Sequence, residues 1–426
     1  MGVADDVAKV RGILTRGVRA LSARRVVRAR LARRPPVPDG TVEIAVYFTD
    51  GPENLYQVDQ WFEPLRRLHE RHHVTLVSRN WEATRALLDG CPVPVHHAPN
   101  IDALEAFLAS QPVRAVLYVN QNQANFAAMR FADPAHVFIC HGESDKDYMS
   151  SNQLKAYDRV FIAGTASRER IMRKLIDFDE PRLVEVGRPQ VDVDFPGPSL
   201  PPDDRTVVLF APTWEGDRAS MRYSSVISHG PEMVRALVAT GRHRVIYRPH
   251  PRTGISLRAA GAANAHVVKV LRDANAADPA AGHVVDLEGG FGWQLAAADV
   301  AVMDISAVAY DWLATGKPLL VTRPAEPLAR LPESGLVREL SLFDAADAAR
   351  APDIIDAAVR HPEEAHAALV TRYFGDTSPG ASMERFLVAC SQVVEERAAA
   401  LAARGVVAGT DVGAEVTSSD ATAAQP

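Results

Sequence analysis

The chain is poor in cysteine and has no long hydrophobic run. Its 426 residues include three cysteines, an odd number at wide spacings, namely Cys91, Cys140 and Cys390. Such a set favours neither a disulfide framework nor a zinc site. The N-terminal segment, residues 1–40, has no apolar stretch long enough for the core of a signal peptide or for a membrane span. We therefore expect a protein that stays in the cytoplasm.

The loops that would bind a dinucleotide or a nucleoside triphosphate are also missing. The first expected strand is followed by "TDGPENLY", residues 49–56, which has neither the dinucleotide nor the P-loop spacing. "VDVD" at 191–194 resembles a metal-binding DxD but lies in a proline-rich segment without a preceding strand. NAD enzymes and NTPases are thus disfavoured. We assign no cofactor and no metal ligand, and the sequence leaves open whether the protein requires a metal ion.

The N-terminal segment differs in charge from the rest of the chain. Residues 1–40 hold ten Lys and Arg against three Asp, a balance of +7, which leaves −13 elsewhere in a chain of overall charge −6. This asymmetry disfavours a nucleic-acid-binding body. Apolar residues recur at three or four positions between the arginines, at Val7, Val10, Leu14, Val18 and Leu21. Residues 1–34 are therefore either a basic amphipathic helix on an anionic membrane surface or a solvated leader.

The remaining pattern predicts two α/β domains. From residue 41, β-branched runs alternate with amphipathic stretches, as expected for βα units around a parallel sheet. A proline- and aspartate-rich linker follows "PRLVEVG", and a second βα series then begins with "TVVLFAP". We predict two Rossmann-like domains at 41–195 and 205–395, and a disordered tail at 405–426.

Polar residues directly after strands are the candidate site residues, because ligands of open parallel sheets bind beyond the carboxyl ends of the strands. "VFICHGESDK", residues 137–146, ends a buried run on His141, and Gly142 permits a sharp turn after it. A histidine placed there can remove a proton from an alcohol near neutral pH. A structural, hydrogen-bonded histidine is the alternative, and His141 alone does not decide between them.

A second strand ends in "RPHP", where two prolines stiffen the loop around His250 and Arg248 offers a planar fork for phosphate oxygens. We expect an anionic ligand at this loop. The alternatives are a carboxylate partner for Arg248 and a helix cap for His250.

Two further strand ends complete the set. In "MDISAVAYDWLATGKP", Asp304 leads to Ser306, an N-cap whose helix start could bind phosphate, although serine caps many helices without a ligand. In "APTW", Thr213 and Trp214 could contact a base or ribose, or Trp214 could plug the domain junction.

Read in order, these motifs resemble the CDP-glycerol glycerophosphotransferase family, bacterial enzymes that polymerise or prime teichoic acids. The resemblance runs from about residue 110 to about 325 through "HGESDK", "AGTASRERI", "VGRPQVD", "APTW", "RPHP" and "MDISAVAYDWLATGKP". It implies a GT-B architecture, with the CDP-linked donor on the C-terminal domain and the acceptor on the N-terminal side.

The resemblance also implies roles for the candidate residues. His141 matches the proposed base, which would activate an acceptor hydroxyl for attack on the β-phosphorus with release of CMP. Arg248, His250 and Ser306 match residues around the diphosphate. Supporting positions are Asp304, Asp192, Lys146 and Lys317.

The sequence departs from the family pattern at acidic positions. Glu143 and Asp145 follow the His-Gly pair, and Glu215 follows "APTW" where a basic residue is more usual. We interpret them as signs of a less anionic acceptor than a growing polyphosphate.

These expectations combine into a peripheral enzyme on the inner face of the membrane that transfers glycerol-phosphate, or a similar polyol-phosphate, to a lipid-linked wall glycan or teichoic acid-like polymer. The rivals are a nucleotide-sugar glycosyltransferase or epimerase of the same fold, and a non-catalytic membrane-surface scaffold.

Overall fold

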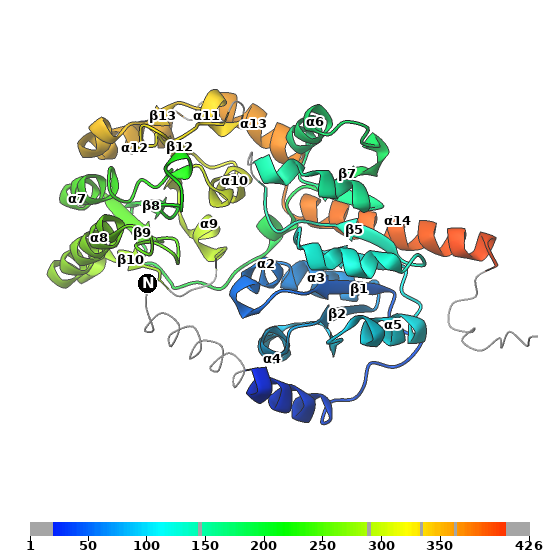
Figure 1. Cartoon of the computed structure of the whole chain (residues 1–426). Coiled ribbons are helices and arrows are strands. Elements are labelled where there is room, and N and C mark those ends of the chain that lie inside the picture. Colours follow the sequence, from blue (N-terminus) through cyan, green and yellow to red (C-terminus); the bar gives the residue numbers. More distant parts are fainter. Residues whose placement is uncertain (1–19, 144–146, 288–290, 333–334, 362–363, 406–426) are drawn as a thin grey trace, which may run out of the picture.

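Two parallel β-sheets, each covered by helices on both faces, form the body of the protein (Figure 1). The computed structural model describes residues 20–143, 147–287, 291–332, 335–361 and 364–405. Every strand pair in both sheets is parallel. Because parallel sheets are buried on both faces, their strands are the continuous β-branched runs of the sequence. The predicted α/β architecture with two Rossmann-like domains is therefore confirmed.

The N-terminal sheet has seven strands in the order β3-β2-β1-β4-β5-β6-β7. They are β1 (Ile44–Phe48), β2 (Val74–Ser78), β3 (Val95–His97), β4 (Ala115–Tyr118), β5 (Ala135–Phe138), β6 (Arg159–Ile162) and β7 (Leu183–Glu185). Its helices are α2 (Tyr56–Asp59), α3 (Phe62–His69), α4 (Trp81–Gly90), α5 (Ile101–Ser110) and α6 (Thr165–Lys174). The strand order reverses at β1 and β4, the position where ligands of doubly wound sheets bind.

The C-terminal sheet has six strands in the order β10-β9-β8-β11-β12-β13. They are β8 (Thr206–Ala211), β9 (His243–Tyr247), β10 (Val284–Val285), β11 (Val300–Met303), β12 (Leu319–Thr322) and β13 (Leu342–Phe343). The helices of this half are α7 (Gly230–Thr240), α8 (Arg258–Ala277), α9 (Trp293–Ala297), α10 (Ala307–Leu313), α11 (Leu336–Glu339), α12 (Ala351–Arg360) and α13 (Glu364–Phe374).

The last helix, α14 (Ala381–Ala403), returns to the N-terminal domain and lies along it beside β5 (Figure 1). Met383, Phe386 and Val393 join the core formed by the inner face of β1 and β4. The predicted C-terminal domain of 205–395 is therefore wrong at its end, because the apolar face of α14 is buried in the other domain. Most of the predicted tail, residues 406–426, lies outside the described residues.

The second half of the basic arm is also part of the N-terminal domain. Residues 20–31 are helical, and Val27 is fully buried in the same core as α14. Arg24 and Arg28 each lie 5.8 Å from the ring centre of Trp81, at the start of α4. The predicted boundary at residue 40 is thus wrong. Leu21 is exposed, and the other predicted apolar positions of the arm, Val7, Val10, Leu14 and Val18, lie outside the described residues.

Candidate active site

His141 lies two residues beyond Ile139, in the turn that follows β5. Its Nδ1 lies 3.1 Å from the carbonyl oxygen of Val119, at the end of the neighbouring strand β4. A carbonyl only accepts, so Nδ1 carries the hydrogen, and in the neutral ring the lone pair is on Nε2. The exposed Tyr56 ring and the imidazole are perpendicular to one another, with 6.3 Å between centroids. This is the tautomer that a general base acting through Nε2 requires.

The turn that carries His141 is strained and firmly held. Cys140 has a φ of +56°, a left-handed conformation that costs free energy in a residue other than glycine. The indole Nε1 of Trp61 donates to the Cys140 carbonyl at 2.7 Å, and burial raises the pKa of the Cys140 thiol to about 11. Strain that persists because the surroundings impose it is common where a side chain must be aimed.

The glycine after His141 brings the turn against the other domain. A Cβ placed on Gly142 would lie 3.7 Å from the Cβ of Ala307, the first residue of α10. The His141 turn therefore touches the start of the helix that follows Ser306. The structure thus brings together two motifs that stand 165 positions apart, on different domains.

The "RPHP" loop follows β9 and has the stiffness expected from its prolines. The backbone N–H of Arg252 donates to Nδ1 of His250 at 3.1 Å, so the neutral ring carries its hydrogen on Nε2. Arg248 Nη1 lies 2.5 Å from Asp286 Oδ2, so the alternative of a carboxylate partner is confirmed. The loop presents a hydrogen-bond donor, His250 Nε2–H, and a guanidinium whose charge Asp286 partly offsets.

Trp214 is a platform for this loop and not a plug between the domains. Its ring stacks on His250 at 6.2 Å between centroids and a 28° interplanar angle. The guanidinium carbon of Arg252 lies 3.7 Å from the centre of the same ring. The neighbouring Thr213 donates its backbone N–H to Asp304 Oδ2 at 2.7 Å. The ends of β8, β9 and β11 are therefore joined into one unit.

Asp304, predicted as a supporting residue on the donor side, is fully buried, and its hydrogen-bond partners belong to the protein itself. Besides Thr213, it accepts hydrogen bonds from the backbone N–H of Ser225 and from the hydroxyl of Thr322, at 3.1 and 2.6 Å. Burial raises the pKa of Asp304 to about 6, although these donors favour the charged form. The carboxylate positions the loop after β8 beside the site.

Ser306 and Lys317 stand at the two ends of the α10 segment. Ser306 is the N-cap of α10, and its buried hydroxyl has no hydrogen-bond partner within the described residues. Lys317 donates to the carbonyls of Leu295, Ala296 and Ala298, at 2.7 to 3.0 Å. Lys317 is thus a structural cap of α9, whereas the hydroxyl of Ser306 is buried at the start of α10.

Asp192 is a helix cap as well. It lies in the 3-10 turn Pro189–Asp192, and its two oxygens accept the backbone N–H groups of Gly380 and Met383 at 2.9 and 2.8 Å. It therefore fixes the start of α14 on the N-terminal domain. Lys146, the remaining supporting residue, lies outside the described residues.

Two of the acidic residues at which the chain departs from the family pattern, Glu143 and Glu215, are buried inside the protein. Glu143 is 5% exposed, lies 2.5 Å from Arg170 and accepts a hydrogen bond from Ser167. Glu215 is 2% exposed and accepts the backbone N–H groups of residues 254, 256 and 257. Neither carboxylate faces an acceptor, so the interpretation that they select a less anionic acceptor is wrong for both. Asp145 lies outside the described residues.

Sequence reasoning missed a cluster of four amide side chains around the carboxylate of Asp50. We call it the amide cluster: Asp50, Asn54, Gln57, Asn120 and Asn122. Asp50 accepts from Asn54, Asn120 and Asn122, and Asn120 also donates to Gln57 Oε1 at 2.7 Å. The cluster lies at the ends of β1 and β4, where the strand order reverses. The run "NQNQAN" at 120–125 was the signal that could have revealed it.

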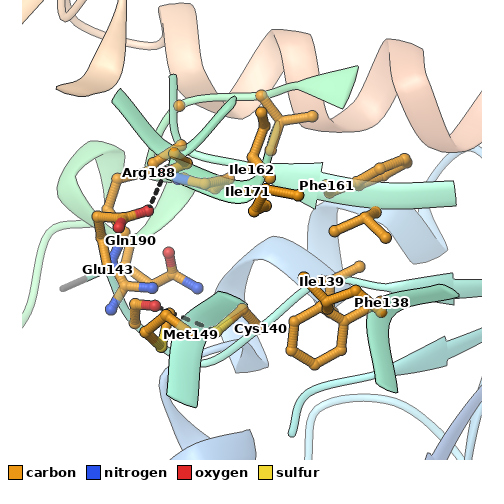
Figure 2. Close-up of a pocket in the computed structure, with 18 of the residues that line it drawn as sticks. Phe138, Ile139, Cys140, Glu143, Met149, Phe161, Ile162, Ile171, Arg188 and Gln190 are labelled. Atoms are coloured by element: carbon orange, nitrogen blue, oxygen red, sulfur yellow. Dashed lines mark hydrogen bonds between the residues drawn. The ribbon is translucent and has the colours of Figure 1, made fainter. Parts of the chain in front are cut away.

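A small cavity lies beneath the His141 turn. Figure 2 shows Glu143, Arg188 and Gln190 on one side of it. The apolar residues Phe138, Ile139 and Phe161 line the other side. Its volume of about 40 Å³ admits a few water molecules and no nucleotide. The cavity is therefore too small to hold a nucleotide-linked substrate.

Within the described ranges, no group of three or more His, Cys, Asp or Glu side chains could hold a metal ion. No helix in the part of the chain that the structure describes is long and apolar enough to cross a membrane.

One protein-family model matches the part of the chain that carries most of the motifs. Residues 139–325 match the model of the CDP-glycerol:poly(glycerophosphate) glycerophosphotransferase family. This range contains His141 and the candidate residues from Asp192 to Lys317. The match confirms the resemblance predicted from the motifs and, with it, the predicted class of enzyme for the part of the chain that carries them. No curated protein matches the chain in sequence.

Solved structures share the fold. The wall teichoic acid polymerase TagF has 13% identity and a TM-score of 0.56, over 83% of this chain and 89% of that chain. A histidine variant of TagF soaked with CDPG has 13% identity and a TM-score of 0.54, over 93% and 100% of the two chains. UDP-GlcNAc 2-epimerase from Neisseria meningitidis, bound to UDP-GlcNAc, has 12% identity and a TM-score of 0.50, over 82% and 100%. These similarities confirm the predicted GT-B fold.

Proposed function

We propose that the protein transfers glycerol-phosphate, or a similar polyol-phosphate, from a CDP-linked donor to a hydroxyl of a lipid-linked wall glycan or teichoic acid-like polymer. One observation carries the proposal: the His141 turn touches the first residue of α10, on the donor-side domain, within the region that matches the transferase family. The contact supports a reaction in which the proposed base on one domain adjoins the start of the helix after Ser306 on the other.

In this reaction His141 is the general base. Its Nδ1–H is held by the Val119 carbonyl, so Nε2 receives the proton of the acceptor hydroxyl. The acceptor oxygen forms a bond to the β-phosphorus as the bond between that phosphorus and the CMP oxygen breaks. CMP leaves with the electron pair, and the proton stays on His141 until solvent removes it.

The donor-side residues stabilise the leaving group. His250 has the opposite tautomer to His141, so its Nε2–H can donate to a phosphate oxygen as negative charge develops there. Arg248 adds a guanidinium that Asp286 holds in place. Ser306, with its buried hydroxyl, completes the donor side.

The amide cluster supports an acceptor rich in hydroxyl groups. Amide groups donate to and accept from hydroxyls and a carboxylate accepts from them, and none of the cluster's hydrogen bonds within the described residues involves Lys or Arg. Asn120, a member of the cluster, directly follows Val119, whose carbonyl orients His141. A polyol or sugar hydroxyl bound there would lie next to the base.

Attachment to the inner face of an anionic membrane would bring the site to a lipid-linked acceptor. In the described half of the arm, Val27 faces the protein core while Arg24, Arg25, Arg28 and Arg33 are exposed. Basic side chains on an outward face are attracted to anionic lipid headgroups.

A nucleotide-sugar epimerase or glycosyltransferase is the second candidate, because UDP-GlcNAc 2-epimerase shares the fold. Incubation of the purified protein with CDP-glycerol, CDP-ribitol and UDP-sugars, followed by chromatography of the nucleotides, distinguishes the two. We expect CMP from a CDP-polyol and no change in the UDP-sugars. Turnover of a UDP-sugar alone would overturn the proposal.

A further inference from the structure

Arg188 is a buried arginine at the boundary of the two domains, and no motif assigned it a role. It follows β7 and is 5% exposed. Its Nε lies 2.8 Å from Asp311 Oδ1 on α10. Its Nη2 lies 2.7 Å from Gln60 Oε1 and 3.2 Å from the carbonyl oxygen of His141. One guanidinium therefore contacts the base turn, the N-terminal domain and the donor-side helix.

The ion pair with Asp311 is sheltered from water. The side chains of Arg188 and Asp311 are 6% and 13% exposed. Burial raises the pKa of Asp311, while Arg188 opposes that effect. Separating the two side chains would leave each buried charge without a partner, which costs free energy. The ion pair therefore holds Arg188 and Asp311 in a fixed relative position.

The contact between Arg188 and His141 fixes the backbone of His141, whereas Val119 contacts only its side chain. Val119 orients the imidazole through Nδ1, whereas Arg188 holds the backbone carbonyl of the same residue. The preceding Cys140 has a strained backbone that relaxes unless its surroundings hold it. Asp311 lies four residues beyond Ala307, one helical turn from the point where α10 meets Gly142.

We propose that Arg188 is a positioning residue that couples the His141 turn to α10, so that the base and the donor-side helix start keep one fixed relative position. This inference rests on the proposed transferase function. Arg188 does not touch the reacting atoms. It acts by holding His141 on one side and Asp311 on the other.

The test compares Arg188→Gln, Arg188→Lys, Asp311→Asn and the double variant Arg188→Gln with Asp311→Asn. The matched control is Arg244→Gln. Arg244 is 2% exposed and pairs with Asp203 at 2.7 Å, at the amino end of β9 and away from the site. Both arginine-to-glutamine changes remove a buried guanidinium, so both should lower the melting temperature.

Only the Arg188 and Asp311 variants should impair catalysis. We expect kcat for CMP release to fall about tenfold or more in Arg188→Gln, because a small misplacement of a catalytic group has large effects. The KM for CDP-glycerol should change little, and the double variant should lose less than the product of the two single losses. Arg188→Lys should recover part of the rate, since lysine can pair with Asp311 but lacks the planar fork.

Hydrogen exchange provides a readout that does not depend on turnover. In Arg188→Gln, the amides of 139–143 and of α10 should exchange faster together, while Arg244→Gln should leave both segments unchanged. If the wild-type protein consumes no CDP-polyol, the proposed function fails and exchange alone tests the coupling. If the wild type is active and Arg188→Gln matches Arg244→Gln in kcat and exchange, the coupling is overturned and the proposed function stands.

Discussion

His141 and His250 are held in opposite tautomers by backbone groups. Nδ1 of His141 donates to the Val119 carbonyl, whereas Nδ1 of His250 accepts the Arg252 N–H. The neutral rings therefore present a proton acceptor on the N-terminal domain and a donor on the C-terminal domain, both at Nε2. A transfer that starts by deprotonating an alcohol and ends by releasing a phosphate needs one of each.

Replacing the candidate base should abolish most of the activity without unfolding the protein. For His141→Asn we expect kcat to fall by about 10²- to 10⁴-fold, the usual contribution of a general base. The control is His96→Asn, a histidine on the edge strand β3 that stacks on Phe107. CMP release and thermal melts check both variants. A rate in His141→Asn close to that of His96→Asn would remove His141 from the mechanism.

Asp304 should make stability depend on pH. Burial raises its pKa to about 6 from an ordinary value of 3.8. Between these values the folded chain binds more protons than the unfolded chain, so this contribution to stability is greatest below pH 4 and is lost as pH rises toward 6. The variant Asp304→Asn has no ionisable group at this position and therefore lacks this pH-dependent contribution to stability.

Urea unfolding at pH 4, 5, 6 and 7 measures the effect. The free energy of unfolding of the wild type, relative to that of Asp304→Asn, should decrease from pH 4 to pH 6 and then level off. The size of the decrease is about 1.4 kcal/mol for each unit of pKa shift. A relative stability that rises over this range would contradict the assignment.

Glu215 should affect the donor loop and acid stability together. Its burial would raise the pKa, but three backbone N–H groups lower it below the ordinary value of 4.5. The stabilisation is therefore present above pH 4.5 and is lost as pH falls through the lower, folded pKa. Glu215→Gln should cost about 1–3 kcal/mol at pH 7 and raise the KM for CDP-glycerol, because the loop after His250 loosens.

The control for Glu215→Gln is Glu232→Gln, at an exposed ion pair on α7. It should change stability by less than about 1 kcal/mol and leave the KM unchanged. Unfolding curves at pH 4 and pH 7, together with donor titrations, check both variants. An unchanged KM in Glu215→Gln would show that the carboxylate does not shape the donor loop.

Local sequence patterns predicted the sheets because buried parallel strands are continuous apolar runs. They also predicted the strand-end residues, since ligands of such sheets bind at that edge. They did not predict the partner of α14, because a helix with an apolar face does not say which domain it covers. Ion pairs between distant positions could not be predicted either, because local patterns do not show which distant residues meet. Arg188 and Asp311, for example, are 123 positions apart.

The roles of single polar residues were the least predictable part of the site. Asp304, Asp192 and Lys317 occupy motif positions, yet they hold backbone groups in place. Glu143 and Glu215 were interpreted as signs of a less anionic acceptor, but Arg170 and the backbone N–H groups before α8 satisfy them. A sequence motif indicates that a side chain is important, but it does not indicate whether that side chain contacts a ligand or the protein itself.

The most direct test of the account is the transfer of glycerol-phosphate, radiolabelled in the glycerol, from CDP-glycerol to membrane lipid. Purified wild-type protein and His141→Asn are each incubated with bacterial membrane vesicles, and label in the lipid extract and CMP in the aqueous phase are measured. The account predicts equal amounts of CMP and lipid-linked label for the wild type and almost none for His141→Asn. Label transfer that is equal in the two proteins, or absent from the wild type, would contradict it.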